Sequence, residues 1–433
     1  MRRLSLEEAA GLVRPQDTLG VPLGPGQPVA FLHALGERDD FRDLRVFSAL
    51  LVGLFQVFTR KGVRLLSGFF GPVERALAAA GHDVHFVPGD FRRFEAILAA
   101  LRPRVMATIA TPPDAAGMLS LSLHAGATLN ELRRCARDPD RILIVETNRA
   151  LPRTCGMPPE HPHALSLEEI DVLVESEREI FTLPDPADSE TSRTIAAHAR
   201  AYVADGATLQ TGIGSIPNDV AALLAEGPGG DYGIHSEMFT TGLMHLHEAG
   251  KVTNRKGIYD GVSVCTFAAG TRELYDWLDG REEVRFLPVD RINEPSIIAR
   301  NRRMTSLNGA LAVDLAGQVA ADALGRRQYS GIGGHEDFVA GAGVSGRSLV
   351  CLPSTAGAGA QRVSRIVSAF EPGTLVTTPR HHVDVVVTEY GAAELAGRTV
   401  EERAEALAAI AHPDFRDALR EAPDSPHPQA PLD

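Results

Sequence analysis

Short runs of β-branched residues alternate along the chain with longer stretches rich in alanine and leucine. Residues 142–145 and 383–387 are runs of the first kind, whereas 94–101 and 401–410 are stretches of the second. The first composition favours buried strands and the second favours helices. Strands that alternate with helices predict an α/β fold with mainly parallel sheets.

The chain of 433 residues is long enough for two or three domains. A polar, proline-rich stretch at 184–189 has the composition of a linker. A strand that runs into glycine, proline and an apolar helix occurs twice, at 17–35 and 207–224. This repeat suggests two similar α/β domains with an active-site cleft between them. We therefore expect α/β domains at 1–186 and 187–420 and a proline-rich, disordered tail at 421–433.

Composition excludes several classes of function. The net charge of −13 disfavours nucleic acid as a partner, and no apolar run is long enough to cross a membrane. The four cysteines lack CxxC spacing, and the N-terminal residues lack the apolar run of a signal peptide. The histidine pairs at 161–163 and 381–382 have no cysteine or carboxylate at ligand spacing, so we expect no metal site. A cytoplasmic protein fits this pattern.

The segment 209–220 reads as a strand, a glycine turn and the start of a helix. Gly212 and Gly214 allow a ligand to approach the backbone, and the helix N-terminus offers N–H groups to an anion. A dinucleotide site is one alternative, because Glu237 follows at about the distance of a ribose-binding acid. However, Pro217 stands where that pattern has its third glycine. A purely structural turn is the other alternative.

Two further features suggest chemistry. Glu237 is expected at a strand end, beside His235 and Ser236. It is either a solvated loop acid or, if partly buried, a carboxylate nucleophile that needs no activating base. The second glycine cluster contains Gly331, Gly333 and Gly334. Such a loop can point several backbone N–H groups at one developing oxyanion, or it can be only a flexible turn.

Taken together, ten segments in one order resemble the acetyl-CoA hydrolase/transferase family, which includes 4-hydroxybutyrate, acetate and propionate CoA-transferases. The resemblance covers about residues 15–420. Its segments are 112–122, 145–152, 208–217, 233–238, 292–295, 308–318, 330–338, 353–356, 387–391 and 411–416.

The resemblance implies roles for three residues. Glu237 matches the catalytic glutamate, which attacks an acyl-CoA and then carries CoA as a glutamyl thioester. The N–H of Gly334 matches the oxyanion donor, and Asn293 matches an asparagine that contacts the thioester or carboxylate. We expect the glycine loops, through Gly212, Gly214, Gly331 and Gly333, to contact CoA. The resemblance also implies acyl-CoA and a short-chain carboxylate as substrates, no tightly bound cofactor, and a homodimer or higher oligomer.

The chain departs from the family at His335 and Glu336, which replace a glutamine and a small apolar residue, and at Thr240–Gly242. These departures leave the acyl group open. The same residues would serve an acyl-CoA hydrolase, with water as the acceptor. A dinucleotide-dependent oxidoreductase and a non-catalytic CoA-binding protein are further alternatives.

Overall fold

The structure is a computed structural model that describes residues 1–433 except 125, 186, 188 and 423–433. The chain forms two compact units. The first contains Met1–Pro184, Glu237–Phe239 and Val262–Asn293, and the rest of the described chain forms the second. The chain first passes from the first unit to the second after Pro184, within the predicted linker. The two later segments group with the first unit, although they lie within the predicted domain 187–420. From residue 423 onward, the predicted tail lies outside the described residues.

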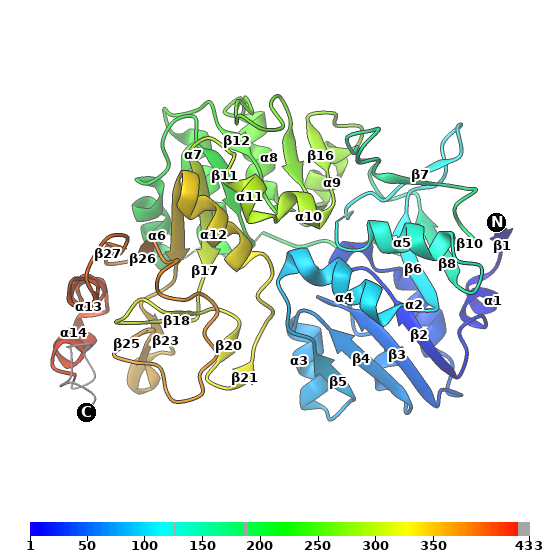
Figure 1. Ribbon diagram of the computed structural model, residues 1–433, viewed down its shortest axis with the longest axis horizontal. Coiled ribbons are helices and arrows are strands. Elements are labelled where there is room, and N and C mark those ends of the chain that lie inside the picture. Colours follow the sequence, from blue (N-terminus) through cyan, green and yellow to red (C-terminus); the bar gives the residue numbers. More distant parts are fainter. Residues whose placement is uncertain (125, 186, 188, 423–433) are drawn as a thin grey trace. The chain divides into compact units, whose positions relative to one another are not determined.

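The first unit is built on a sheet of eight parallel strands in the order β1-β10-β8-β6-β2-β3-β4-β5. Figure 1 shows β2, β3, β4 and β5 side by side. The strands are β1 Arg2–Arg3, β2 Gln16–Gly20, β3 Asp43–Ser48, β4 Val63–Ser67, β5 Val84–Phe86, β6 Val105–Ala110, β8 Ile142–Asn148 and β10 Val172–Ser176. The main helices are α1 Leu6–Ala10, α2 Val29–Gly36, α3 Pro72–Ala79, α4 Phe94–Leu101 and α5 Leu129–Ala136.

Both faces of this sheet are buried. Along β10, Val172 and Val174 join one apolar cluster, whereas Leu173 between them joins another. Successive side chains of a strand point to opposite faces, so each cluster fills one side of the sheet. Burial on both sides explains why the strands read as continuous apolar runs rather than alternating ones.

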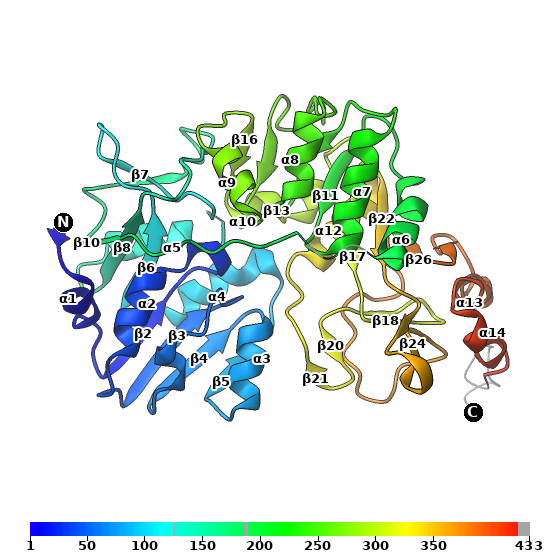
Figure 2. The same ribbon diagram turned by 180° about the vertical axis from the view of Figure 1, so that it is seen from behind.

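The second unit has a sheet in the order β12-β11-β17-β22-β26-β27, parallel except for its edge strand β27. Figures 1 and 2 show α11 and α12 over one face of this sheet and α6, α7 and α8 over the other. The strands are β11 Thr208–Thr211, β12 Gly233–Ile234, β17 Met304–Gly309, β22 Arg347–Cys351, β26 Val385–Thr388 and β27 Gly391–Glu394. The helices are α6 Glu190–Arg200, α7 Ser215–Glu226, α8 Thr241–Glu248, α11 Pro295–Ile298, α12 His335–Ser345, α13 Val400–Ala409 and α14 Pro413–Arg420.

The returning segments complete the first unit. They contribute β13 Met238–Phe239, β14 Ser263–Cys265, β15 Phe267–Ala268, β16 Val284–Phe286, α9 Arg272–Leu278 and α10 Val289–Ile292. Three apolar side chains from them, those of Met238, Phe267 and Val289, pack into the same core cluster as Leu173 of β10. This shared core is why the chain returns to the first unit. The predicted α/β class with mainly parallel sheets is confirmed in both units.

Candidate functional site

Glu237 is held by its backbone in the first unit. Its carbonyl accepts hydrogen bonds from the N–H groups of Thr266 (2.9 Å) and Phe267 (3.3 Å). Directly after it, β13 pairs in parallel with β15. The residue is half-buried. These backbone hydrogen bonds therefore fix the position of the Glu237 main chain.

Asn293 brings an amide to this carboxylate. Its Nδ2 donates a hydrogen bond of 2.6 Å to Oε2 of Glu237. Asn293 is fully buried at the end of α10, where its own N–H donates to the carbonyl of Val289. Two of the three residues that the resemblance assigns to catalysis thus meet in one unit, although they are 56 positions apart in the sequence.

This pair suits nucleophilic chemistry. A hydrogen bond to a carboxylate is strong, and it fixes the direction of one oxygen. An amide donor carries no charge, so it orients the carboxylate without forming an ion pair with it. A positioned carboxylate can attack an electrophilic carbonyl without a general base.

The two predicted glycine loops both lie in the second unit. Gly214 is the N-cap of α7 with a φ of 126°, and Gly334 is the buried N-cap of α12. Neither cap position supplies a side-chain hydrogen bond to its helix. The helix α7 follows β11, and α12 precedes β22 in the same parallel sheet, so both N-termini face its carboxyl edge. The N–H groups of a helix's first turn and the helix dipole attract anions, so this edge is suited to one.

The remaining glycines of these loops differ in their surroundings. At Gly212, an added Cβ would meet no atom within 4 Å, so the space above this backbone is open. Gly333 has a φ of 56°, which favours glycine at that turn, whereas Gly331 is buried. The loop 331–334 is therefore a shaped turn that leads into α12.

The two departures after Gly334 have distinct environments. His335 is buried, and burial lowers its pKa to about 4, so the imidazole is neutral at neutral pH. Glu336 and Nδ1 of His382 lie 2.5 Å apart in a hydrogen bond. The side chain of Glu336 is thus engaged with His382.

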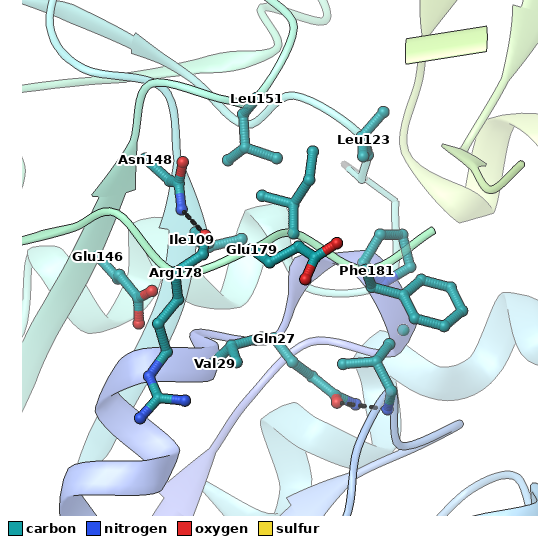
Figure 3. Close-up of a pocket in the computed structure, with 14 residues that line it drawn as sticks. Gln27, Val29, Ile109, Leu123, Glu146, Asn148, Leu151, Arg178, Glu179 and Phe181 are labelled. Atoms are coloured by element: carbon teal, nitrogen blue, oxygen red, sulfur yellow. Dashed lines mark hydrogen bonds between the residues drawn. The ribbon is translucent and has the colours of Figure 1, made fainter. Parts of the chain in front are cut away.

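A second crevice lies at the carboxyl edge of the first sheet, where β2 has β3 on one side and β6 on the other. Figure 3 shows Gln27, Glu146 and Asn148 among the residues that line it. Such switch points are the usual ligand sites of parallel sheets. Here the space is about 10 Å³, room for one water molecule at most.

The polar groups of this crevice bond to the chain itself. The Glu146 carboxylate accepts hydrogen bonds from the backbone N–H groups of Ala30 (3.2 Å) and Phe31 (2.9 Å), in the first turn of α2. Asn148 Nδ2 donates to the carbonyl of Arg178 over 2.7 Å. Burial raises the pKa of Glu146. Sequence reasoning missed this capping role, because it depends on how β8 is placed beside α2.

Two absences concern the described part of the chain only. No group of three or more potential ligands is placed to hold a metal ion among residues 1–422 that the structure describes. Among those residues, no helix combines the length and apolar character needed to cross a membrane.

Comparisons with known proteins place the chain in a family. Residues 270–423 match the model of the acetyl-CoA hydrolase/transferase C-terminal domain. The 4-hydroxybutyrate coenzyme A transferase of Clostridium kluyveri is 35% identical over 404 residues, with 91% of this chain and 90% of that protein covered. The probable butyrate:acetyl-CoA coenzyme A-transferase of Syntrophomonas wolfei is 39% identical over 433 residues, with 96% and 93% covered.

A solved structure agrees with these sequences. RipA from Yersinia pestis matches with a TM-score of 0.88 and 33% identity, and 97% of this chain and 96% of that chain are covered. The chain therefore belongs to the acetyl-CoA hydrolase/transferase family, a class of enzymes. The family predicted from the order of the sequence segments is confirmed.

Proposed function

We propose that this enzyme moves coenzyme A from a short-chain acyl-CoA to a carboxylate acceptor of the acetate or 4-hydroxybutyrate type, through a thioester on Glu237. The observation that carries the proposal is the 2.6 Å hydrogen bond from Asn293 to the half-buried Glu237 carboxylate. Membership of a family whose relatives are named for CoA transfer supports it.

In the first half-reaction, a carboxylate oxygen of Glu237 attacks the acyl-CoA carbonyl. The C–S bond breaks, CoA leaves as a thiolate, and an acyl–glutamyl anhydride remains. The thiolate then attacks the glutamyl carbonyl, which gives glutamyl-CoA and frees the donor acid as its carboxylate. Asn293 orients the carboxylate before attack and can donate to the glutamyl carbonyl afterwards.

The second half-reaction reverses these steps with a new acid. The acceptor carboxylate attacks glutamyl-CoA and forms a second anhydride with loss of thiolate. The thiolate attacks the acyl carbonyl of that anhydride, which yields the new acyl-CoA and restores the Glu237 carboxylate. One thioester and one carboxylate are consumed and one of each is formed, so no redox partner or external energy source is needed.

The second unit supplies the anion contacts in this proposal. The N–H of Gly334 stabilises the tetrahedral oxyanion, and the loops at Gly212–Gly214 and Gly331–Gly333 contact CoA. The support is that two helices with glycine at the N-cap begin at one edge of the same sheet. Removal of one oxyanion donor typically costs about 100- to 1000-fold in kcat.

Trapping the intermediate tests the proposal. The enzyme is incubated with acyl-CoA, treated with borohydride and digested, and the peptide that contains Glu237 is analysed by mass spectrometry. We expect that glutamate to be reduced to an alcohol only when acyl-CoA is present. An unmodified peptide from an active preparation would contradict the thioester.

Hydrolysis is the second candidate, favoured by the family model, which covers both hydrolases and transferases. Water would then attack glutamyl-CoA in place of the acceptor acid. Acyl-CoA consumption is measured with and without added acetate. A transferase requires the acid, whereas an equal rate without any acid would assign hydrolysis.

The cysteines bear on where the enzyme works. All four are free, and Cys265 and Cys351 are buried in β14 and β22. Burial raises the pKa of Cys351 to about 12, so its thiol is unreactive. Free thiols fit a reducing cytoplasm. Cell fractionation checks this, and transfer activity in a membrane or extracellular fraction would contradict it.

A further inference from the structure

One short segment of the first unit touches both partners of the Glu237–Asn293 pair. We call residues 121–124 together with Gly126 the support segment. The Leu123 carbonyl accepts a hydrogen bond of 2.8 Å from the N–H of Ala268 in β15, the strand that pairs with β13 directly after Glu237. His124 forms a bridge with Phe267, whose own N–H donates to the Glu237 carbonyl.

The same segment also holds the helix that ends at Asn293. The Gly126 carbonyl accepts a hydrogen bond of 3.0 Å from the N–H of Val289, the first residue of α10. The carbonyl of Val289 in turn accepts from the N–H of Asn293 over 2.8 Å. The support segment is therefore bonded to the backbone on both sides of the 2.6 Å carboxylate–amide contact.

The support segment packs tightly against Thr266, a residue bonded to the Glu237 backbone. A Cβ added to Gly126 would lie 1.3 Å from Oγ1 of Thr266. The N–H of Thr266 is the closer of the two donors to the Glu237 carbonyl. No side chain fits at position 126 unless Thr266, the residue bonded to the Glu237 carbonyl, gives way.

The support segment itself is held in an unfavourable backbone conformation. Ser122 is fully buried and has a φ of 58°, in the left-handed region that non-glycine residues rarely adopt. Such a conformation costs about 1–3 kcal/mol and persists only where the surroundings enforce it. The path of the backbone through Leu123 and His124 thus depends on contacts that other parts of the chain make with Ser122.

Two side chains supply those contacts from one loop region. Thr154 Oγ1 donates a hydrogen bond of 2.6 Å to the Ser122 carbonyl, and His163 Nε2 lies 2.8 Å from the same oxygen. The Ser122 hydroxyl donates to the carbonyl of Pro152 over 2.6 Å. Both Thr154 and His163 are buried.

The His163 ring is itself fixed. It stacks on Phe286 with ring centroids 5.0 Å apart, and Phe286 lies in β16, which pairs with β14 just before β15. Burial lowers the pKa of His163 to about 4. The ring is therefore neutral at neutral pH, and its contact with a carbonyl assigns the proton to Nε2.

We propose that Thr154 and His163 are positioning residues for the reaction: by holding the Ser122 carbonyl they set the support segment, and through it the geometry of Glu237 and Asn293. This inference rests on the proposed function. It adds two residues that act through their contacts with the Ser122 carbonyl.

Thr154→Val tests the inference, because it removes the hydroxyl and keeps the shape. We expect kcat to fall about tenfold or more, since small displacements of reacting groups are costly. The KM for acyl-CoA should change less than about twofold, because the anion contacts are elsewhere. Thr154→Ser should restore most of the rate. A wild-type kcat in Thr154→Val, or an equal loss in Thr154→Ser, would overturn the inference.

A matched control separates positioning from general stability. Thr147 is also buried in the first unit, and its hydroxyl donates to the carbonyl of Val174 over 3.3 Å, away from the support segment. Thr147→Val should lower thermal stability but leave kcat unchanged. If Thr147→Val loses as much kcat as Thr154→Val, the effect is general loosening and the inference fails.

His163→Phe provides an independent variant if Thr154→Val does not fold. It keeps an aromatic ring over Phe286 but removes the donor, so we expect the same kcat loss with little change in KM. The rate at which glutamyl-CoA accumulates is measured by borohydride trapping in each variant. If wild type yields no trapped thioester, the proposed function fails. If wild type is trapped and both variants match its rate, the inference alone fails.

Discussion

The carboxyl edges of the two main sheets differ in how the helix N-termini beside them are satisfied. In the first unit, α2 begins against the buried carboxylate of Glu146, which accepts two of its N–H groups. In the second unit, α7 and α12 begin at Gly214 and Gly334, which have no side chain with which to cap their own helices. The chain thus supplies its own carboxylate at the first edge, whereas at the second edge our proposal assigns the anion to the substrate. The comparison teaches that a carboxylate of the chain can itself occupy the position at a switch point where a ligand usually lies.

The largest expected effect tests whether the first unit contributes the nucleophile, Glu237. Glu237→Gln keeps the shape of the side chain but removes the nucleophile, so we expect kcat to fall by about 10⁴-fold or more. Thermal melting should stay close to that of wild type. The matched control is Glu282→Gln, an exposed glutamate of the same unit, which should retain full activity. Substantial CoA transfer by Glu237→Gln would show that Glu237 is not the nucleophile.

The second prediction places a carboxylate of the chain at the carboxyl edge of the second sheet. Ser215 is the first residue of α7, and Ser215→Asp places a carboxylate in the first turn of that helix. We expect the KM for acyl-CoA to rise about three- to tenfold, while the helix gains about 0.3–1 kcal/mol from its dipole. The neutral variant Ser215→Asn is the control. A more stable protein with an unchanged KM would show that α7 does not face the substrate anion.

The third prediction concerns the closed edge and its pH dependence. Burial raises the pKa of Glu146 above its ordinary value of 4.5, so the folded state binds the proton more tightly than the unfolded state does. The contribution of this group to stability is therefore largest below about pH 4.5 and is lost as pH rises through the folded pKa.

Glu146→Gln removes this titration. Melting of both proteins is measured at a series of pH values above 4.5, and we expect the stability difference to shift in favour of the variant as pH rises through the folded pKa of Glu146. Parallel melting curves across that range would show that the Glu146 carboxylate does not titrate there.

The smallest expected effect probes the open space above the first glycine loop. Gly212→Ala adds a Cβ that meets no atom within 4 Å, so stability should change by less than about 0.5 kcal/mol. If CoA passes over this backbone, kcat/KM for acyl-CoA should fall about two- to fivefold. Gly343→Ala in α12, which is equally unobstructed, should leave kcat/KM unchanged. Equal kinetics in the two variants would place CoA away from Gly212.

Much of the fold was predictable because its signals are local. The β-branched runs at 142–145 and 383–387 became parts of β8 and β26, and the stretch 401–410 became most of α13. The resemblance named Glu237 and Asn293 but not the contact between them, and no local rule links residues 56 positions apart. The return of 237–239 to the first unit was not predicted. It depends on two-residue strands, which carry no periodicity.

The support segment was also beyond local reasoning. Its sequence reads as an ordinary serine–leucine stretch, and nothing in it signals a left-handed residue at Ser122. The side chains that contact its carbonyl, those of Thr154 and His163, lie 32 and 41 positions further along the chain. Tertiary contacts of this kind become visible only once the strands are placed.

The path of the chain between its units has a consequence for synthesis. The first unit begins with a strand at Arg2, yet part of its apolar core is supplied by Val289. A ribosome must therefore release nearly 300 residues, including a large part of the second unit, before the first can close its core. A fragment that ends at Pro184 lacks these core residues and would expose apolar surface. We therefore expect the first unit to fold only as part of the longer chain.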